Sequence, residues 1–183
     1  MRYAVASRSN MDLSLFITFL LWTGQARGEI HYLNDHNIPG STCTSSCPEE
    51  WEEDGEHCYY WNSQYLAWSP AEEFCNDRGG HLAAVTTHET TVFLLKLTKT
   101  KTTSEKFWIG GTDKATEGTW TWTDGSPMNY TNWAAGKPSE TDKFWRQQDC
   151  LAVYFADGTW SDKVCEPRFN TKQSVCSRHL CPG

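Results

Sequence analysis

The stretch CPEEWEEDGEHC, which runs from Cys47 to Cys58, decides the fold, and the aromatic residues YYW follow it directly. Further cysteines occur at wide spacing, and the motif WIGG lies between them from Trp108 to Gly111. An even number of cysteines without paired CxxC motifs favours disulfide bridges in an oxidising compartment over a zinc site. The sequence therefore indicates a secreted domain stapled by disulfides. Its eight cysteines are Cys43, Cys47, Cys58, Cys75, Cys150, Cys165, Cys176 and Cys181.

Residues 1–28 are expected to be a signal peptide for secretion to the extracellular space. Arg2 and Arg8 precede an apolar stretch from Leu13 to Trp22. This stretch is shorter than the helix of about 20 apolar residues that spans a bilayer. Small residues match the site that signal peptidase reads, so we expect cleavage after Gly28. An uncleaved anchor is the alternative, and Met11 is an alternative start. No later segment is expected to insert into a membrane.

The composition is acidic, with 183 residues and a formal net charge of −7. Removal of residues 1–28 takes away three arginines and one aspartate, which moves the net charge to −9. An acidic protein repels nucleic acids and anionic membrane surfaces, so neither is an expected partner. The remaining length suits one domain. We place this domain at residues 43–181, after a short flexible leader at residues 29–42.

The early part of the chain carries two helix signals. Ser69-Pro70-Ala71-Glu72 predicts a helix start with a capping box, and Gly79-Gly80 predicts the end of that helix. A second capping box, Thr86-x-x-Glu89, predicts another helix with one buried face. The apolar residues expected on that face are Val92, Phe93, Leu94 and Leu97.

The later part of the chain carries strand signals, so the predicted class is α+β. Residues 98–106 are rich in Lys and Thr and predict a solvated loop. Short alternating runs between turn residues predict strands at 107–109, 120–122 and 151–155. The segment 124–150 has little strand signal, and long irregular segments of this kind are usually functional.

The run from Cys47 to Cys176 resembles a long-form C-type lectin domain. The resemblance implies two helices packed on antiparallel β-sheets, a long irregular loop region, and a domain that binds sugars, proteins or surfaces. It also implies three disulfide bridges. Cys43 and Cys181 are left over just outside this run, so we expect them to pair, with an interchain bridge as the alternative. The implied bridges are Cys47–Cys58, Cys75–Cys176 and Cys150–Cys165.

The resemblance also implies a calcium and sugar site, and the sequence departs from the family pattern there. Sugar-binding members carry Glu-Pro-Asn or Gln-Pro-Asp after an Asn-Trp pair, where this chain has Lys-Pro-Ser. Calcium takes oxygen ligands, and an ammonium has no lone pair to give, so calcium is not expected at this site. The loop then binds sugar without the metal, binds a protein, or is rebuilt around Glu140 and Asp142. The matching positions are Lys137, Pro138, Ser139, Gln148, Ser161 and Asp162.

A second, auxiliary calcium position of the family is better preserved. Its candidate ligands are carboxylates, and four carboxylates that converge on one point repel each other unless a cation lies between them. The alternative is a solvated acidic turn, for which Asp and Glu are ordinary residues. An ion here would order the loops and would not touch the ligand. The candidate ligands are Asp113, Glu117, Glu140 and Asp149.

Three further observations bear on function. No catalytic motif is present, and nothing sets a nucleophile against His57, His81 or His88, so enzyme activity is not expected. Asn129-Tyr130-Thr131 is a glycosylation sequon. Most tryptophans are expected to serve the core, whereas Trp145 is the best candidate for an exposed contact residue. Those that the resemblance places in the core are Trp108, Trp122 and Trp133.

These observations together predict a secreted lectin for extracellular or innate-immune recognition. Its expected partners are glycans or glycoproteins on cell or microbial surfaces, bound without calcium at the altered loop. Two alternatives stay open. One is a protein-binding module without sugar binding, and the other is a structural protein at a mineral or ice surface.

Overall fold

The computed structural model describes residues 46–139, 141, 144–166 and 170–180. The predicted signal peptide and leader lie outside the described residues. The predicted bridge between Cys43 and Cys181 lies outside them too, as do Glu140 of the auxiliary calcium position and Asp142.

The fold begins with a β-hairpin stapled by a disulfide. Strand β1 (Glu52–Asp54) pairs antiparallel with β2 (His57–Leu66). Gly55 occupies the turn with φ of 63°, a left-handed conformation that favours glycine. The Cys47–Cys58 bridge links the chain before β1 to β2. The stretch CPEEWEEDGEHC therefore forms β1, the turn and the start of β2 in this hairpin.

The first helix, α1 (Trp68–Asn76), begins one residue before Ser69. Its N-cap is Ala67, which offers no side-chain cap, so the predicted capping box is wrong. The physical reason is that the carboxylate of Glu72 forms its hydrogen bond outside the helix. It accepts the backbone N–H of Leu82 at 2.7 Å and thereby ties the helix to the next strand.

The predicted end of α1 is confirmed. Gly79 has φ of 71°, and the N–H of Gly80 donates to the carbonyl of Cys75 at 3.1 Å. A Cβ atom at position 80 would lie 2.4 Å from the carbonyl oxygen of Ser177, so only glycine fits against that strand.

The second helix, α2 (His88–Thr98), is capped by Thr87 and not by Thr86. The Thr87 hydroxyl accepts the N–H of Thr90 at 3.1 Å. The prediction that Val92 faces the core is wrong, because 52% of its surface is exposed. The helix ends inside the stretch predicted to be a solvated loop. Its buried residues are Thr90, Thr91, Leu94, Leu97 and Thr98.

The remaining strands join the hairpin in one sheet with the order β1-β2-β8-β4-β6-β7, and β3 and β5 pair with β8 and β4. The predicted strands are confirmed to within three residues at each end. Among the named strands of the described residues, all pairings are antiparallel except β4 with β8, where Trp108 pairs with Ser174 in parallel, so the implied antiparallel arrangement needs this correction. The bounds are β3 (His81–Leu82), β4 (Lys106–Thr112), β5 (Thr121–Trp122), β6 (Cys150–Tyr154), β7 (Trp160–Lys163) and β8 (Lys172–His179).

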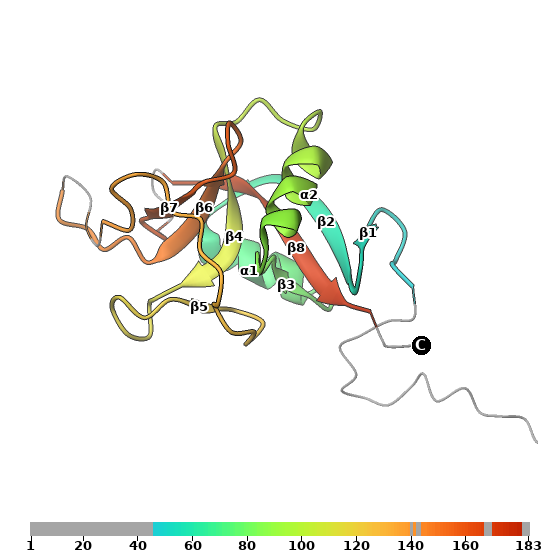
Figure 1. Cartoon of the computed structure of the whole chain (residues 1–183), viewed down its shortest axis with the longest axis horizontal. Coiled ribbons are helices and arrows are strands. Elements are labelled where there is room, and N and C mark those ends of the chain that lie inside the picture. Colours follow the sequence, from blue (N-terminus) through green and yellow to red (C-terminus); the bar gives the residue numbers. More distant parts are fainter. Residues whose placement is uncertain (1–45, 140, 142–143, 167–169, 181–183) are drawn as a thin grey trace, which may run out of the picture. The chain divides into compact units, whose positions relative to one another are not determined.

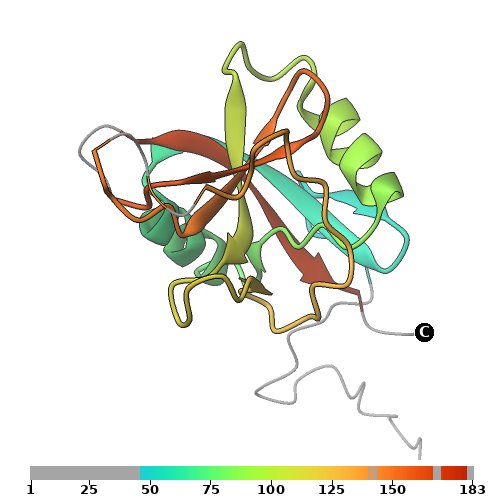
Figure 2. The same ribbon diagram turned by 60° about the vertical axis from the view of Figure 1, so that its left-hand side comes forward.

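The two helices lie on opposite sides of β8 in both views of the fold (Figures 1 and 2). Each helix covers its own core. The α2 side packs Leu94 and Leu97 with Phe107, Trp122 and Trp160. The α1 side packs apolar residues around two disulfides. The residues of this second core are Trp68, Ala71, Cys75, Leu82, Trp108, Cys150, Ala152, Cys165 and Cys176.

Three implied disulfides are confirmed. Cys47–Cys58, Cys75–Cys176 and Cys150–Cys165 each have a Cα–Cα distance of 5.4 Å, which suits a disulfide. Two of them lie in the core beside α1, so they link that helix and the loop region to the sheet.

The tryptophans follow the predicted division. Trp108 and Trp122 are buried, and Trp133 is half-buried with its ring centroid 5.8 Å from that of the buried Trp160. Large aromatic side chains therefore fill the core that holds the loop region, as aromatic residues commonly do.

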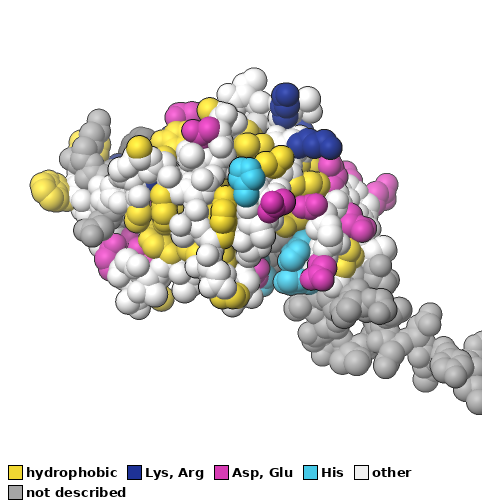
Figure 3. All heavy atoms as spheres, viewed as in Figure 1, with side chains coloured by type: hydrophobic (Ala, Val, Ile, Leu, Met, Phe, Trp, Pro, Cys, Tyr) yellow, Lys and Arg dark blue, Asp and Glu magenta, His cyan; other side chains and the backbone are white. Residues whose placement is uncertain are grey.

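The face seen in Figure 3 carries acidic side chains around β1 and α2. They belong in part to the acidic run from Glu49 to Glu56.

None of the described helices is long and apolar enough to cross a membrane.

Candidate functional site

The altered sugar loop is attached to β7 by backbone hydrogen bonds. The N–H of Trp160 donates to the carbonyl of Asn132 at 2.7 Å, and the N–H of Ala134 donates to the carbonyl of Trp160 at 2.9 Å. The loop that follows contains a cis peptide bond between Lys137 and Pro138. These hydrogen bonds hold the Lys-Pro-Ser motif next to β7, whose first three residues are buried.

Four of the six predicted loop positions meet in one hydrogen-bonded group, which we call the loop cluster: Lys137, Ser139, Gln148 and Asp162. The Nζ atom of Lys137 lies 2.7 Å from Oδ1 of Asp162 and donates to Oγ of Ser139 at 2.7 Å. The backbone N–H and the hydroxyl of Ser139 both donate to Oδ2 of Asp162, at 2.7 and 3.0 Å. Gln148 donates its amide Nε2 to Oγ of Ser139 at 2.7 Å.

The loop cluster carries its own cation. The Asp162 side chain has no exposed surface and that of Lys137 is only 18% exposed. A buried carboxylate needs a counter-charge. Oδ1 of Asp162 accepts no aligned hydrogen bond among the described residues, so the ammonium is its only close partner there. Lys137 therefore neutralises Asp162 where a calcium ion would need oxygen ligands.

The hydrogen-bonding capacity of Ser139 is fully used inside the loop cluster. Its hydroxyl has one donor and two acceptor positions, and these serve Asp162, Lys137 and Gln148. The residues present do not fit calcium ligation in the manner of the family.

The other two predicted loop positions do not join the cluster. Ser161 is buried, and its hydroxyl donates to the backbone carbonyl of Asp162 at 3.3 Å. Pro138 is exposed at the tip of the motif.

Two of the four predicted auxiliary calcium ligands come together. The N–H of Asp113 donates to the carbonyl of Asp149 at 3.3 Å, and the carboxylate of Asp113 accepts the N–H of Gly118 at 3.0 Å. Oδ1 of each aspartate is buried and accepts no hydrogen bond among the described residues. Burial raises the pKa of both carboxyls, and the charge of Asp149 adds to the rise in the pKa of Asp113.

Of the two remaining auxiliary positions, only Glu117 is described by the structure. Glu117 is exposed and accepts a hydrogen bond from Nε2 of Gln147 at 2.8 Å, while Glu140 lies outside the described residues. Within the described part of the chain, no three potential metal ligands gather as a site. The two buried carboxylate oxygens of Asp113 and Asp149 therefore supply part of the ligand set that a cation needs.

The long loop presents an aromatic pair to solvent. The side chain of Trp145 is 87% exposed and that of Phe144 is 63% exposed. Trp145 has φ of 62°, which is uncommon for a bulky residue. The guanidinium carbon of Arg146 lies 5.3 Å from the centroid of the Phe144 ring. The prediction that Trp145 is exposed is therefore confirmed.

The sequon residue Asn129 is exposed, as attachment of a glycan requires. Its neighbours Tyr130 and Trp133 are half-buried against the core, so the asparagine and not the aromatic rings faces solvent.

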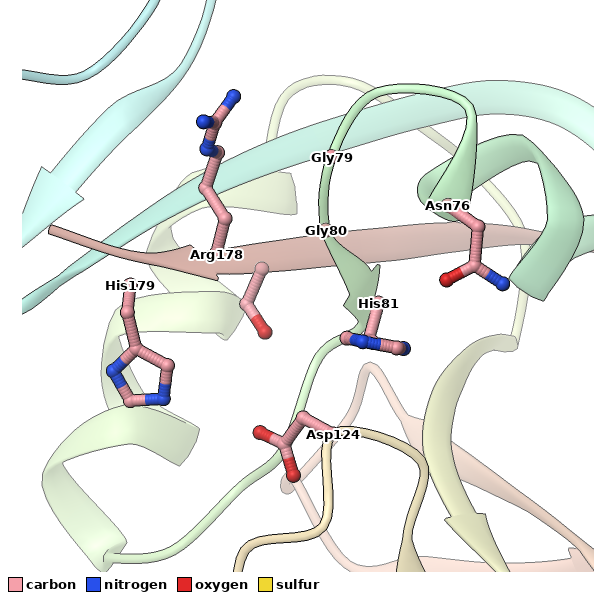
Figure 4. Close-up of a pocket in the computed structure, with 8 residues that line it drawn as sticks. Asn76, Gly79, Gly80, His81, Asp124, Arg178 and His179 are labelled. Carbon is pink, nitrogen blue, oxygen red and sulfur yellow. The ribbon is translucent and has the colours of Figure 1, made fainter. Parts of the chain in front are cut away.

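A hollow of about 240 Å³ lies between the end of α1 and the end of β8 (Figure 4). The rings of His81 and His179 and the carboxyl of Asp124 surround it, whereas the guanidinium of Arg178 points away. Nδ1 of His81 lies 2.7 Å from the carboxylate of Glu72. That carboxylate serves the helix connection described above, and no described side chain is activated as a nucleophile here.

A second hollow, of about 340 Å³, lies beside the starts of β4 and β8 and the end of β7. Three lysines line it: Lys106, Lys163 and Lys172. No local sequence pattern marks these lysines, because they are far apart in the chain and each resembles an ordinary surface lysine.

Comparison with protein families places this geometry in a known context. Residues 64–178 match the family model described as the lectin C-type domain. The chain is 32% identical over 138 residues to the galactose-specific lectin nattectin of Thalassophryne nattereri, covering 75% of this chain and 83% of that protein. It is 33% identical over 154 residues to a type-2 ice-structuring protein of Hemitripterus americanus, covering 79% and 88%.

Solved structures show the same fold. The carbohydrate-recognition domain of the mouse scavenger receptor C-type lectin matches with a TM-score of 0.63 and 31% identity, over 75% of this chain and 99% of that chain. A calcium-independent type II antifreeze protein matches with a TM-score of 0.64 and 28% identity, over 74% and 96%.

Proposed function

The chain belongs to the lectin C-type domain family, and from this membership we propose that it is a secreted glycan-binding protein whose sugar loop works without calcium. One observation carries the proposal. The Lys137 ammonium lies 2.7 Å from the fully buried Asp162 carboxylate, so the loop has an internal cation in place of a bound one. The loop is therefore ordered before any metal or ligand arrives.

Glycan binding is supported by the exposed aromatic pair Phe144 and Trp145, which lies close in sequence to Gln148 of the loop cluster. The face of an aromatic ring packs well against apolar C–H groups, and Trp145 is held in a left-handed backbone conformation with most of its surface in solvent. Uncommon conformations of this kind concentrate at ligand-binding positions. We assign Trp145 as the main stacking residue for the sugar, and Phe144 as its neighbour.

Secretion is supported by the residues that the structure describes and by the sequence before them. Three disulfides indicate an oxidising compartment. The proposed signal peptide at residues 1–28 would deliver the domain there, and the exposed Asn129 would carry a glycan. The proposed partners are glycans or glycoproteins on cell or microbial surfaces, bound without chemical conversion.

Calcium is proposed only for the auxiliary position. Asp113 and Asp149 would hold the ion through their two buried carboxylate oxygens that accept no hydrogen bond from the described residues, and Glu140 is the further candidate ligand. When bound, the ion would supply positive charge that holds the loops together. It would not contact the sugar.

A glycan array compares the parent with Trp145→Gly. The variant should fold as well as the parent, because glycine tolerates the left-handed conformation, and it should lose most of its array signal. Val92→Ala, which shortens an exposed apolar residue on α2, is the control and should retain the signal. An unchanged array pattern in Trp145→Gly would contradict the assigned contact surface. Absence of any array signal for the parent would contradict glycan binding itself.

Ice binding is the second candidate function, because both an ice-structuring protein and an antifreeze protein are similar to this chain. An assay of ice recrystallisation decides between the two. We expect no inhibition at concentrations where the array gives a signal. Inhibition by a parent that binds no glycan would favour the ice function.

A further inference from the structure

The hollow beside the starts of β4 and β8 gathers positive charge, and we call it the lysine pocket. Its volume is about 340 Å³. Besides three lysines it presents hydroxyl and amide groups that can donate hydrogen bonds. The lining residues are Tyr65, Ser104, Glu105, Lys106, Lys163, Asn170, Thr171 and Lys172.

The sheet topology brings the lysines together. Strands β4 and β8 run parallel with Trp108 opposite Ser174, so Lys106 and Lys172 hold equivalent positions two residues earlier on neighbouring strands. Neighbouring strands lie about 5 Å apart, which places the two side chains next to each other. Lys163 arrives from the end of β7.

Aromatic rings hold two of the ammonium groups in place. Nζ of Lys172 lies 4.2 Å from the centroid of the Trp108 ring, and Nζ of Lys106 lies 4.0 Å from that of Tyr154. Rings at this distance attract a cation and reduce the motion of the lysine side chain. The pocket therefore has preorganised charges and not freely moving ones.

The positive charge of the pocket is not balanced by the described residues. Lys106 pairs with Glu105 at 2.9 Å, but the Glu105 side chain is 76% exposed. Lys172 donates to the amide oxygen of Asn170, which is neutral. Lys163 forms no ion pair with any described residue. Among the described lining residues, three cations thus share one exposed carboxylate, and Asp162, the other acid that acts on Lys163, is already paired with Lys137. The formal net charge of the chain is −7.

The ionisation of the pocket reflects this imbalance. Burial, followed by the charges of Lys163 and Lys106, lowers the pKa of Lys172 to about 8. Burial and the charges of Lys137 and Lys106 also lower the pKa of Lys163. A bound anion would relieve this repulsion.

We propose that the lysine pocket binds a tetrahedral oxyanion, namely a sulfate or phosphate group carried by a polysaccharide. Such a group has several acceptor oxygens, which match the three ammoniums and the hydroxyl of Thr171. The acidic remainder of the protein repels polyanions, so attraction must come from a local site.

This site is separate from the sugar loop. Lys163 follows Asp162 directly in β7, and successive residues of a strand point to opposite faces of the sheet. The lysine pocket and the loop cluster therefore use different faces of the same strand. A ligand of the pocket need not touch the loop, although the charge of Lys137 acts on Lys163, so each site is tested with variants of its own residues.

The experiment measures binding of the full-length secreted protein to immobilised dextran sulfate and to a phosphorylated mannan, with neutral dextran as the blank. The parent should bind at least one of the charged polymers and not the blank. Lys163→Gln combined with Lys172→Gln should lower the affinity for the charged polymers at least about 10-fold. The double variant removes two ammonium groups, and hydrogen bonds from a charged donor to an oxyanion are stronger than those between neutral groups. Competition by inorganic sulfate or phosphate identifies which oxyanion is preferred.

A matched control separates a site from general charge. Lys99→Gln combined with Lys101→Gln removes the same charge from exposed positions just after α2, and should leave the affinity nearly unchanged. Lys163→Arg should retain binding, and near-ultraviolet circular dichroism confirms that each variant is folded. Equal losses in the two double variants, or no binding of the parent to either charged polymer, would overturn the proposal. Trp145→Gly should bind the charged polymers like the parent, which keeps this result distinct from that of the glycan array.

Discussion

At the scale of single residues, Lys137 does with a side chain what a bound ion does in a metal site. Its ammonium lies 2.7 Å from Asp162 and donates to Ser139, so one residue neutralises the buried carboxylate and fixes the loop. A tethered cation is always present at its site. The loop is therefore expected to keep its shape in a chelator, which an ion-dependent loop would not do.

Removal of the Lys137 charge should destabilise the domain. Lys137→Met leaves Asp162 buried without its counter-charge, which should cost about 2 to 4 kcal/mol of unfolding free energy. Urea denaturation measures the loss. Lys101→Met breaks an exposed ion pair with Glu52 and should cost less than about 1 kcal/mol.

A double variant then tests the cause of that loss. Asp162→Asn removes the buried charge, so Lys137→Met combined with Asp162→Asn should recover part of the stability lost in Lys137→Met. Equal stability of Lys137→Met and the parent would show that the ion pair does not hold the loop.

Lys172 should make stability depend on pH in the alkaline range. Its pKa is lowered to about 8 in the folded protein, so the unfolded chain binds more protons between pH 8 and the ordinary lysine pKa. Stability therefore rises with pH as Lys172 loses its proton, by roughly 1 to 2 kcal/mol after allowance for solvent exposure. The groups that act on Lys172 are Lys163, Lys106 and Glu105.

The measurement is the melting temperature of the parent and of Lys172→Met from pH 7 to pH 9.5. The parent should gain relative to the variant across this range. Tyr59, whose pKa is raised by burial, opposes the gain only at higher pH, where the unfolded state loses its tyrosine proton first. Parallel curves for the two proteins would contradict the lowered pKa of Lys172.

At the scale of elements, the loop after β4 should respond to calcium through Asp113 and Asp149. Burial raises the pKa of both carboxyls, so their contribution to stability is present at low pH and is lost as pH rises through the folded pKa. A bound cation would offset the cost of burying these two charges. Calcium at a hundredfold excess over its Kd should then stabilise the protein by about 2.7 kcal/mol.

Asp113→Asn combined with Asp149→Asn should abolish the calcium effect and should raise stability in calcium-free buffer. Asp77→Asn, an exposed change beyond α1, should leave the calcium effect intact. An unchanged melting temperature of the parent across millimolar calcium would show that Asp113 and Asp149 bind no ion and belong to an ordinary acidic turn.

The elements also show which parts of the fold the sequence could predict. Helix and strand existence followed from periodicity and turn residues, and the resemblance identified three of the disulfides. The first helix starts two residues before its predicted start, and its Glu72 bonds to Leu82 across the fold, whereas the second starts one residue late because Thr87 caps in place of Thr86. Such choices depend on tertiary contacts that a local pattern does not contain.

The candidate site was predictable to a similar extent. The resemblance aligned Lys137, Ser139, Gln148 and Asp162 as one group, but not the distances that make them a closed cluster. The lysine pocket was beyond prediction, since it depends on the one parallel strand pair of the described sheet, that between β4 and β8. Lys106 and Lys172 become neighbours only through that pairing.

At the scale of the whole molecule, the remaining cysteines should close the chain ends. Cys43 and Cys181 lie outside the described residues, and we predict that they form an intramolecular bridge. Cys43→Ser combined with Cys181→Ser should fold and stay monomeric with a modest loss of stability, because Cys75–Cys176 already constrains nearly the same loop. A parent that runs as a dimer on a non-reducing gel, with a monomeric double variant, would show an interchain bridge.

The most direct test of a calcium-free sugar loop is titration calorimetry with the glycan that binds best on the array. The titration is performed in millimolar calcium and repeated in excess chelator. Because the Lys137 ammonium replaces the ion beside Asp162, we expect the same Kd in both buffers. Binding that disappears in chelator and returns when calcium is restored would contradict it.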